Sequence, residues 1–598
     1  MMQRVADYVI SRLVDKSVRH VFMISGRGIL YLTDALAKNT DIDAICTFHE
    51  QGASFAAMAY AANSNSIGAC LISTGCASTN AVTAALCAWQ DSIPCIFISG
   101  QNTLNETTHH TKSKKRTYGS QEANIIRIVE PITKYAVMVE EAEQIKYVMD
   151  RAISEAVNGR RGPVWIDIPL DIQNTRIDPN LLNGFNYKTI STCSNDAVIE
   201  IKNEIKKSKR PIILLGGGSR SIIDSPCLSE TIEIMNIPVV FTSSAVDVYG
   251  SGNYLSIGAV GSLAGSRPGN FAIQNADYVL VLGSKLSSQT IGPLPDYFAK
   301  DARITVVDID EEEHKAPLVK LHKLITCDIK EFLTLMKNEY REKDYTHHEW
   351  NEKCQSWKKM FDISMEKFYV ESKKNDVIDL YLFADSLSKK ISEKTTVITD
   401  AGLEQLIIPS TIKFKKGQKC LFPSNQGSMG FAIPAILGAH YSGSKEIVTV
   451  VGDGSIMMNI QELQIISSKG INCKIFVINN NMYAIIRKRQ HDLFRERTIG
   501  NDPSDGVPSP DFKAIANCFG FNYSKITSVK ELDDNLSDIL NSNKRMMCEI
   551  ICPAEQKYLH TSYAFDEKRK IVKRTLEDLS PFLDRETIKK ELITKYIG

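Results

Sequence analysis

The sequence lacks several features that mark whole classes of protein. Its 598 residues carry 71 Lys and Arg against 70 Asp and Glu, a formal net charge of +1. This balance argues against a nucleic-acid partner, because binding a polyanion requires a basic face. No apolar run approaches the roughly 18 residues of a membrane span, so no membrane partner is expected.

Cysteine pairs with metal-ligand spacing are also missing. The 14 cysteines are scattered and include no CxxC pair, which argues against structural zinc and against a disulfide framework. The first residues show no charged start followed by an apolar run, so no secretory signal is recognised. We therefore expect a cytoplasmic protein.

Strand-like apolar runs alternate with helical periods over most of the chain, which is typical of a parallel α/β fold. Polar residues at about 174–196 and Lys/Glu-rich residues at about 330–375 are interpreted as linkers. We predict three doubly wound parallel-sheet domains and a charged C-terminal tail, at residues 1–180, 195–340, 375–555 and 556–598.

The sharpest signal lies in the third predicted domain. A buried-strand pattern at 446–451 leads into Gly452-Asp453-Gly454-Ser455 and then into a helical pattern at 456–469. Such a strand–turn–helix junction directs free backbone N–H groups toward a phosphate. A second predicted strand at 473–478 ends in Asn479-Asn480-Asn481, and 24 residues separate Gly454 from Asn479, which suits one helix and the next parallel strand.

This spacing brings Asp453 and Asn480 to one edge of the predicted sheet. Mg²⁺ prefers near-octahedral oxygen ligation and usually keeps phosphate oxygens in its shell. The Asp453 carboxylate, the Asn480 amide oxygen and the Met482 backbone carbonyl would supply such ligands. The alternative is a tight turn without a ligand, since Asp and Gly are common turn residues. The two motifs together favour a diphosphate–magnesium site.

GDGS followed by NN at this spacing resembles the signature of thiamine-diphosphate enzymes, and the chain apart from its tail resembles the acetolactate synthase family. The resemblance implies a pyrimidine-binding first domain, a central Rossmann-like domain and a diphosphate-binding third domain. The supporting segments are TFHEQGA at 47–53, TGCASTN at 74–80, DSIP at 91–94, GQ at 100–101, GP at 162–163, DIP at 167–169 and GSMG at 427–430.

The resemblance implies catalytic roles for Glu50, Gln121 and Met429. The glutamate matching Glu50 bonds the aminopyrimidine of thiamine diphosphate and promotes loss of the thiazolium C2 proton, a task for a partly desolvated carboxyl. Taken alone, Glu50 is an acid in a helix first turn and Met429 a core residue. Gln121 matches a residue near the substrate. The implied cofactor contacts are Gly26, Glu50, Thr74, Asn80, Gly402, Gly427, Met429, Gly452, Asp453, Gly454, Ser455, Asn480, Met482 and Tyr483.

The middle block follows the order of the family's central domain, which holds FAD in acetolactate synthases. A glycine run after a strand is by itself a weak nucleotide signal. The family's GxRFDDR segment reads GSKLSSQ at 283–289, so both arginines are missing. We expect FAD, the alternative being a structural spacer. The implied flavin residues are Gly216, Gly217, Gly218, Gly258, Gly261, Asp308 and Asp328.

The resemblance implies a thiamine-diphosphate- and Mg²⁺-dependent carboligase that forms an acyl carbanion from pyruvate, a 2-oxo acid, and adds it to a carbonyl acceptor. Arg489 stands where biosynthetic enzymes have an acceptor-selecting tryptophan, and the basic residues 487–489 form either a solvated helix face or a contact with an anionic acceptor. The tail resembles those of carboligases in surface-sugar pathways. Three alternatives stay open: acetyl transfer to a nucleotide-linked keto-sugar, a benzaldehyde-lyase-like or simple decarboxylase outcome, and a catalytically silent homologue that serves as an assembly partner.

The resemblance also implies a subunit arrangement. In this fold the first domain of one subunit and the third domain of another complete each active site. A monomer would hold half-sites, so we expect a homodimer or a homotetramer.

Overall fold

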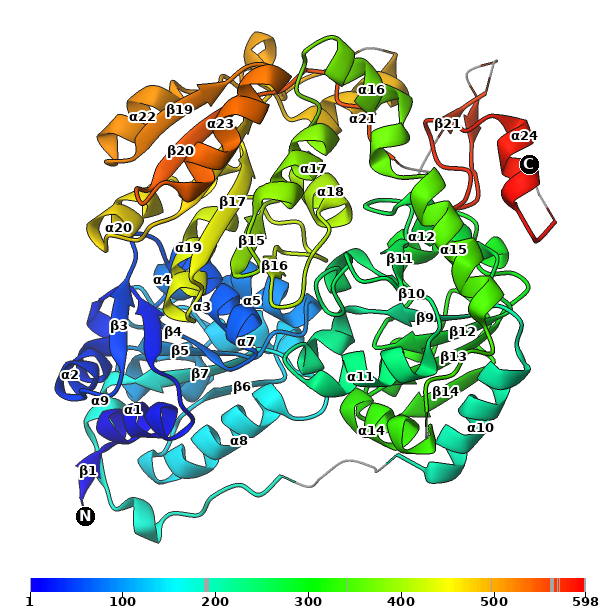
Figure 1. Ribbon diagram of the computed structural model, residues 1–598. Helices are drawn as coiled ribbons and strands as arrows, with labels where there is room; N and C mark the ends of the chain where they lie inside the picture. Colours follow the sequence, from blue (N-terminus) through cyan, green and yellow to red (C-terminus); the bar gives the residue numbers. More distant parts are fainter. Residues whose placement is uncertain are drawn as a thin grey trace.

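Three six-stranded sheets follow one another along the chain, each flanked by helices (Figure 1). The computed structural model describes residues 2–187, 193–340, 342–495, 497–559, 564–566, 568 and 570–595. Within this part of the chain, all strand pairs of the three sheets are parallel. The predicted α/β class with three doubly wound parallel sheets is therefore confirmed.

The first sheet has the strand order β3-β2-β4-β5-β7-β6. Its strands are β2 (His20–Met23), β3 (Asp43–Cys46), β4 (Gly68–Ile72), β5 (Cys95–Gln101), β6 (Tyr135–Met138) and β7 (Val164–Pro169). Its helices are α1 (Val5–Asp15), α2 (Leu30–Lys38), α3 (Glu50–Ser64), α4 (Cys76–Asn80), α5 (Val82–Gln90), α6 (Thr108–Thr111), α7 (Ile125–Val129), α8 (Ile145–Val157) and α9 (Leu170–Asn174).

The third sheet repeats this topology, with the order β16-β15-β17-β18-β20-β19. In both outer sheets the first and third strands along the chain are neighbours, so the strand order reverses between them and leaves a crevice at their carboxyl ends. The strands are β15 (Thr395–Thr399), β16 (Lys419–Leu421), β17 (Glu446–Gly452), β18 (Lys474–Asn479), β19 (Asn522–Ile526) and β20 (Met546–Ile551). The helices are α17 (Leu380–Lys390), α18 (Leu403–Thr411), α19 (Ala432–Tyr441), α20 (Glu462–Ser468), α21 (Ala484–Phe494), α22 (Phe512–Cys518) and α23 (Val529–Asn541).

The central sheet differs, with the order β11-β10-β9-β12-β13-β14. This is the Rossmann order 3-2-1-4-5-6, which reverses between its first and fourth strands. The strands are β9 (Pro211–Leu215), β10 (Val239–Phe241), β11 (Ser256–Ala259), β12 (Tyr278–Leu282), β13 (Arg303–Asp308) and β14 (Lys323–Thr326). The helices are α10 (Asn195–Lys207), α11 (Pro226–Met235), α12 (Arg267–Gln274), α13 (Ser288–Ile291) and α14 (Ile329–Glu339).

The two stretches interpreted as linkers carry more structure than expected. In the first, β8 (Arg176–Ile177) pairs antiparallel with β1 (Gln3–Arg4); its residues 188–192 lie outside the described part of the chain. In the second, α15 (His348–Met360) and α16 (Lys367–Lys374) follow α14. Two buried tryptophans of α15 belong to the core of the central domain, so α15 is a layer of that domain and not a linker.

The C-terminal residues also pack on the central domain. Trp357 of α15 donates its indole N–H to Glu591 at 3.0 Å, and Glu591 closes α24 (Arg585–Glu591). Leu576 and Leu579 are buried. The short hairpin of β21 (Ala564–Phe565) and β22 (Ile571–Val572) precedes this segment. The predicted tail thus joins the core of the middle domain through apolar contacts and a buried carboxylate.

The first and third domains meet through two helices rich in small residues, α3 and α19. A Cβ on Gly438 would lie 2.3 Å from the Ala56 carbonyl oxygen, so the helix backbones approach closely. The rings of Phe55 and Phe431 pack edge to face, with centroids 5.6 Å apart. This contact fixes the two repeated sheets relative to each other.

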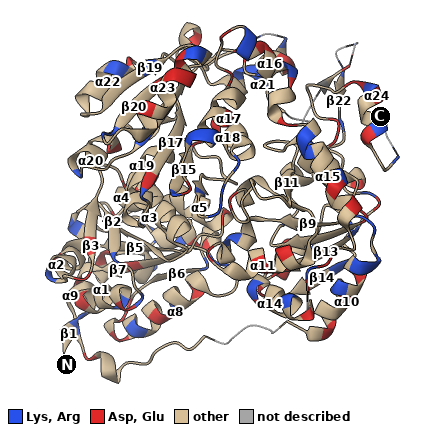
Figure 2. Ribbon diagram, in the orientation of Figure 1, with Lys and Arg blue, Asp and Glu red and all other residues tan. Residues whose placement is uncertain are grey.

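Positions of Lys and Arg and positions of Asp and Glu are interspersed along the ribbon in Figure 2. Among the described residues, no helix combines the length and apolarity needed to cross a bilayer.

The packing of the tail yields a stability prediction at Arg267, which is 2% exposed. Its guanidinium pairs with Glu366 and donates to the carbonyls of Leu579, at 3.2 Å, and Pro581. Arg267→Met leaves a buried carboxylate without its partner, a change that costs about 3–5 kcal/mol. We expect a lower midpoint of thermal unfolding and faster proteolysis within residues 570–595.

The matched control is Lys315→Met, which removes an exposed pair with Glu312 and should leave the midpoint nearly unchanged. An equal midpoint for wild type and Arg267→Met, with an equally protected tail, would show that Arg267 does not hold the tail.

Candidate functional site

The turn after β17 is built around the carboxylate of Asp453, which is 5% exposed. Its Oδ1 accepts the N–H of Gly454 at 2.8 Å, and its Oδ2 accepts the N–H of Asn481 at 2.7 Å and the Ser509 hydroxyl at 3.0 Å. Burial raises the pKa of Asp453 in spite of these bonds. The carboxylate therefore joins the turn after β17 to the loop after β18.

The loop after β18 carries Asn480, Met482 and Tyr483. The amide oxygen of Asn480 accepts the N–H of Met482 at 3.2 Å. The Tyr483 ring covers the glycine turn, because a Cβ on Gly454 would lie 2.0 Å from Tyr483 Cε1. Ser455 is buried. The structure thus brings together, at one sheet edge, the residues predicted to bind diphosphate and metal.

Two buried acids beside this turn were missed by the sequence analysis. Asp400 directly follows β15, and burial raises its pKa to about 6. Glu404 lies two residues beyond Gly402; burial raises its pKa to about 8, with further contributions from the charges of Asp453 and Asp400. A Cβ on Gly402 would meet Glu404 Oε2 at 2.6 Å. The sequence offered two weak signals for these acids: Asp400 stands at the end of a strand pattern, and Glu404 stands near a glycine.

The GSMG turn presents Met429 next to these acids. Asp400 Oδ2 accepts the N–H groups of Gly430 at 3.2 Å and of Ala432 at 3.0 Å. Gly427 and Gly430 adopt φ values of 61° and 86°, a region that favours glycine. Met429 itself is half-buried. Asp400 therefore fixes the loop on which the predicted apolar support stands.

The matching edge of the first sheet is also built on close backbone contacts. A Cβ on Gly26 would lie 2.3 Å from Ser73 Oγ, and one on Gly28 would lie 2.0 Å from Thr74 Oγ1. The Thr74 hydroxyl donates to the Gly100 carbonyl at 3.2 Å. The loops after β2 and β4 and the end of β5 therefore meet where the strand order reverses.

Glu50 begins α3, and Asn80 Nδ2 donates to its Oε2 at 2.9 Å. The side chain of His49, the N-cap of α3, accepts the N–H of Gln51. Gln121 is exposed and has a φ of 59°. Its carbonyl oxygen abuts the start of α4, since a Cβ on Gly75 would lie 1.7 Å from it. The structure thus places Glu50, Asn80, Thr74 and Gln121 around one edge.

Within one chain, the segment that follows the Asp453 turn of the third domain contacts the residues around Glu50 in the first domain. The helical pattern predicted at 456–469 is split into a 3₁₀ turn, η11 (Ile456–Asn459), and α20. Asn459 donates to Gln51 Oε1 at 3.0 Å. Glu462 accepts the N–H groups of Phe48 and His49, and burial raises its pKa to about 7. Sequence reasoning missed Glu462, which showed only as an acid inside a helical pattern.

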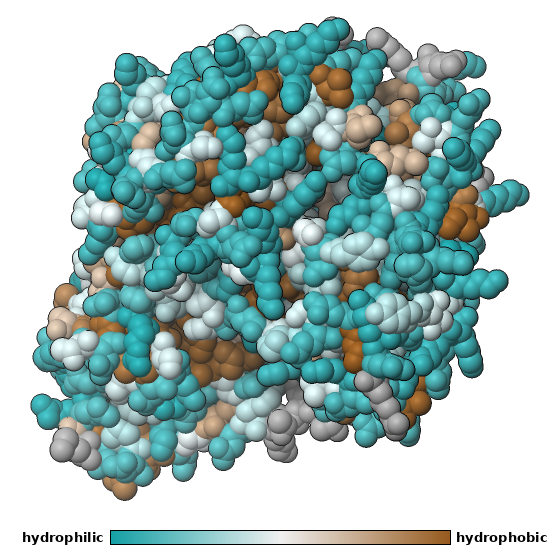
Figure 3. Space-filling view, in the orientation of Figure 1, coloured by the Kyte–Doolittle hydropathy of each residue, from teal (hydrophilic) through white to brown (hydrophobic). Residues whose placement is uncertain are grey.

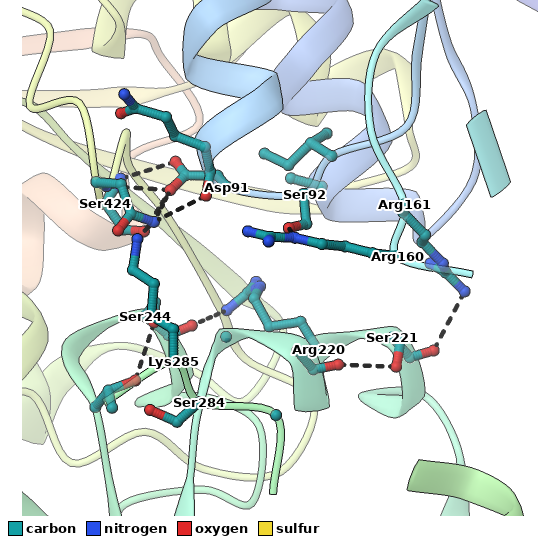
Figure 4. Close-up of a pocket in the computed structure, with 18 of the residues that line it drawn as sticks. Asp91, Ser92, Arg160, Arg161, Arg220, Ser221, Ser244, Ser284, Lys285 and Ser424 are labelled. Atoms are coloured by element: carbon teal, nitrogen blue, oxygen red, sulfur yellow. Dashed lines mark hydrogen bonds between the residues drawn. The ribbon is translucent and has the colours of Figure 1, made fainter. Parts of the chain in front are cut away.

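A cavity of about 470 Å³ lies between the three domains. Its lining includes Arg160 and Arg161 from the first domain, Arg220 and Lys285 from the central domain, and Ser424 from the third. In Figure 4 Arg160 and Arg161 extend in opposite directions, and Arg161 points toward Ser221. Arg160 and Arg220 are paired with acids, Arg160 with Asp310 and Glu313, Arg220 with Asp247. Burial lowers the pKa of Arg161.

The predicted flavin residues divide into two sets. Gly217, Gly218, Asp308 and Asp328 line the cavity, although the Asp328 carboxylate also caps α14 by accepting the N–H of Lys330 at 2.8 Å. The other three glycines are outside the described lining and serve close packing. A Cβ on Gly216 would lie 2.2 Å from the Gly283 carbonyl oxygen. One on Gly258 would lie 2.2 Å from Ser266 Oγ, and one on Gly261 would lie 2.9 Å from the Gln289 carbonyl oxygen.

The basic residues 487–489 lie on α21, which has no buried residue. Arg487 pairs with Asp502, and Lys488 pairs with Asp492 at 2.8 Å. Arg489 is exposed. Local carboxylates therefore balance two of the three charges in this predicted basic cluster.

Comparison with known proteins agrees with this geometry. Residues 3–122 match the N-terminal TPP binding domain of the thiamine pyrophosphate enzymes, residues 198–336 match their central domain, and residues 400–550 match their C-terminal TPP binding domain. The three matches fall on the three sheets in chain order.

Similar curated proteins are acetolactate synthases. The large subunit from Lactococcus lactis subsp. lactis is 29% identical over 91% of this chain and 92% of its own length. The isozyme 1 large subunit from Escherichia coli is 28% identical over 92% and 94%, and the chloroplastic enzyme from Arabidopsis thaliana is 26% identical over 93% and 82%. The chain belongs to the thiamine-diphosphate-dependent enzymes and, among them, to the acetolactate synthase family of carboligases.

Proposed function

We propose that this carboligase decarboxylates pyruvate, or a closely related 2-oxo acid, and joins the retained acyl unit to a carbonyl acceptor. The observation that carries the proposal is the buried Asp453 at the joined ends of β17 and β18. The names of the relatives support an acetolactate-synthase-like reaction over the keto-sugar and silent-homologue alternatives. The bond between Asn80 and Glu50 also supports a working acid–base residue.

The residues present fit thiamine diphosphate. Gly402, with a φ of 115°, and Gly454, over which the Tyr483 ring packs, place no side chain of their own beside Asp453, so a diphosphate can approach the N–H groups of the turn. When bound, the cofactor supplies the electron sink for loss of CO₂ from the 2-oxo acid. The other proposed contacts in the third domain are Gly427, Met429, Gly452, Ser455, Asn480, Met482 and Tyr483.

The chain's own residues supply position and proton transfer. Glu50 would hold and exchange a proton at the pyrimidine ring, and Asn80 orients its carboxyl. Gly26 and Thr74 would shape the pyrimidine end, Met429 would support the cofactor, and the exposed Gln121 would be available to the substrate. Partial desolvation suits a carboxyl that shares its proton with a ring nitrogen.

Asp453, Asn480 and the Met482 carbonyl would hold Mg²⁺. All three donors are oxygens, the ligand type that Mg²⁺ prefers. The pKa of Asp453 is raised by burial, so a divalent cation would stabilise the ionised carboxylate that burial disfavours.

A homodimer or homotetramer is part of the proposal. Phe48, Met457 and Met458, which flank Glu50 and Asp453 in sequence, are large apolar side chains with 57%, 44% and 50% exposure. Apolar patches lie over the first and third domains on the face shown in Figure 3. Burial of such surface against a second copy would complete the half-sites.

FAD is proposed for the cavity between the domains. Gly217 and Gly218 lie at the end of β9, where the central strand order reverses, and Asp308 and Asp328 lie at the ends of β13 and β14. In this topology dinucleotides bind at that crevice. The cavity volume of about 470 Å³ lies within the range of ligand pockets, roughly 300–1,000 Å³.

The first prediction concerns the reaction. With thiamine diphosphate, Mg²⁺ and pyruvate, the protein should release CO₂ and accumulate acetolactate. Glu50→Gln should lower the rate by roughly 10²- to 10⁴-fold, because a general acid–base group contributes about that much. Unchanged turnover in Glu50→Gln would remove Glu50 from the mechanism, and no CO₂ from any 2-oxo acid would refute the proposed reaction.

The second concerns the metal site. Asp453→Asn keeps the shape of the side chain but not its charge, and should weaken Mg²⁺-dependent binding of thiamine diphosphate by at least about 10-fold, measured by titration calorimetry. The matched control, Asp538→Asn, lies on the exposed face of α23 and should bind like wild type. Equal affinities in all three proteins would exclude Asp453 as a ligand.

The third concerns the flavin. The purified protein should release flavin on heat denaturation, detected by fluorescence. Gly217 lines the cavity, and a Cβ there has Ser244 Oγ as its nearest neighbour at 3.1 Å. Gly217→Leu should therefore fill the cavity and lower flavin content while thiamine diphosphate content is kept. A wild-type protein without flavin would overturn this part of the proposal.

A further inference from the structure

The backbone that leads into Glu50 is held by a carboxylate from the third domain. The N–H of Phe48 donates to Glu462 Oε1 at 3.1 Å and to Oε2 at 3.2 Å, and the N–H of His49 donates to Oε1 at 3.1 Å. Glu462 is 0% exposed. Such charge-assisted bonds to N–H groups are stronger than neutral ones. The two residues before Glu50 are thus anchored to α20.

A glycine in α3 makes this approach possible. A Cβ on Gly52 would lie 2.6 Å from Glu462 Oε1 and 3.0 Å from its carboxyl carbon. Glycine inside a helix costs roughly 0.5–1 kcal/mol relative to alanine, so this position gives up helix stability to make room for the carboxylate. A second contact supports the same segment, because Asn459 donates to Gln51 Oε1 at 3.0 Å.

The orientation of Glu50 depends on these anchors. Glu50 is the first residue of α3, and the preceding residue, His49, is extended, with φ −142° and ψ 142°. The direction of the Glu50 side chain is set by where the chain enters the helix. Asn80 restrains one carboxyl oxygen, Oε2, whereas Glu462 restrains the backbone from which the side chain projects.

We propose that Glu462 is a positioning residue for Glu50: its carboxylate fixes the entry of α3, so that Glu50 presents its carboxyl to the pyrimidine of the cofactor. This inference rests on the proposed role of Glu50. It assigns Glu462 no contact with cofactor or substrate.

The test measures exchange of the cofactor C2 hydrogen for deuterium in the loaded enzyme, by quenched flow and NMR, without substrate turnover. Glu462→Ala should slow exchange by about 10- to 100-fold, the effect of a displacement of order 1 Å, while cofactor affinity stays within about threefold of wild type. Glu462→Gln retains an oxygen that can accept both N–H groups and should restore most of the rate.

Gly52→Ala provides an independent test that leaves Glu462 in the chain. The added methyl displaces the carboxylate, so exchange should slow as in Glu462→Ala. If Glu462 had only a structural role, Gly52→Ala would exchange at the wild-type rate. Since alanine favours the helix, the thermal midpoint of Gly52→Ala should not fall. The control is Glu577→Gln, a buried carboxyl of the tail that accepts from Gln274 at 2.8 Å and should leave exchange unchanged.

Glu50→Gln in the same assay separates the two ideas. If it slows exchange while Glu462→Ala and Gly52→Ala match wild type, the positioning role of Glu462 is wrong and the proposed function stands. If Glu50→Gln itself exchanges at the wild-type rate, the role of Glu50 is wrong. Slowed exchange in Glu462→Ala only together with loss of cofactor binding would also overturn the inference.

Discussion

The reversal of strand order is the constraint on which the site depends. In each outer sheet the first and third strands are neighbours, so successive connections leave in opposite directions and cannot fill the crevice between them. Gly26 and Thr74 follow β2 and β4, while Gly402 and Asp453 follow β15 and β17. The central sheet uses a different order but the same rule, and its cavity lies at the ends of β9 and β12. The protein thus uses one topological device three times.

The buried acids of the third domain lower the stability of the fold. Asp400, Glu404 and Asp453 are all nearly excluded from solvent, and burial raises the pKa of each. An acid whose folded pKa is raised destabilises the fold as pH rises from its unfolded pKa to its folded one. The divalent cation proposed at Asp453 would favour the ionised form of that carboxylate and would stabilise the folded state by mass action. Asp453 would in this way couple the stability of the fold to binding of the proposed metal.

The sequence predicts those site residues that lie in short motifs at a characteristic spacing. GDGS and NN are each read from one strand and its turn, and parallel pairing of β17 with β18 brings them together. The anchor between Glu462 and Phe48 spans 414 residues, and the Asp91 bond to Ser424 spans 333; no local pattern indicates either. The tryptophans of α15 look like part of a linker helix until the central sheet supplies their partner. The hydrophobic periodicity of the sequence does not predict contacts that depend on how two domains pack against each other.

The long-range contacts also explain why the two half-sites of one chain cannot move independently. The segment that leaves the Asp453 turn reaches Asn459 and Glu462 within one short turn and the start of α20. Asn459 binds Gln51 in the first turn of α3, and Glu462 binds the two residues that precede α3. A shift of the diphosphate-binding turn is therefore transmitted to the backbone that carries Glu50. The close packing of α3 on α19, which leaves no room for a Cβ at Gly438, prevents the two domains from absorbing that shift by sliding. The position of Glu50, the proposed acid–base residue, is thus fixed by the close packing of α3 on α19.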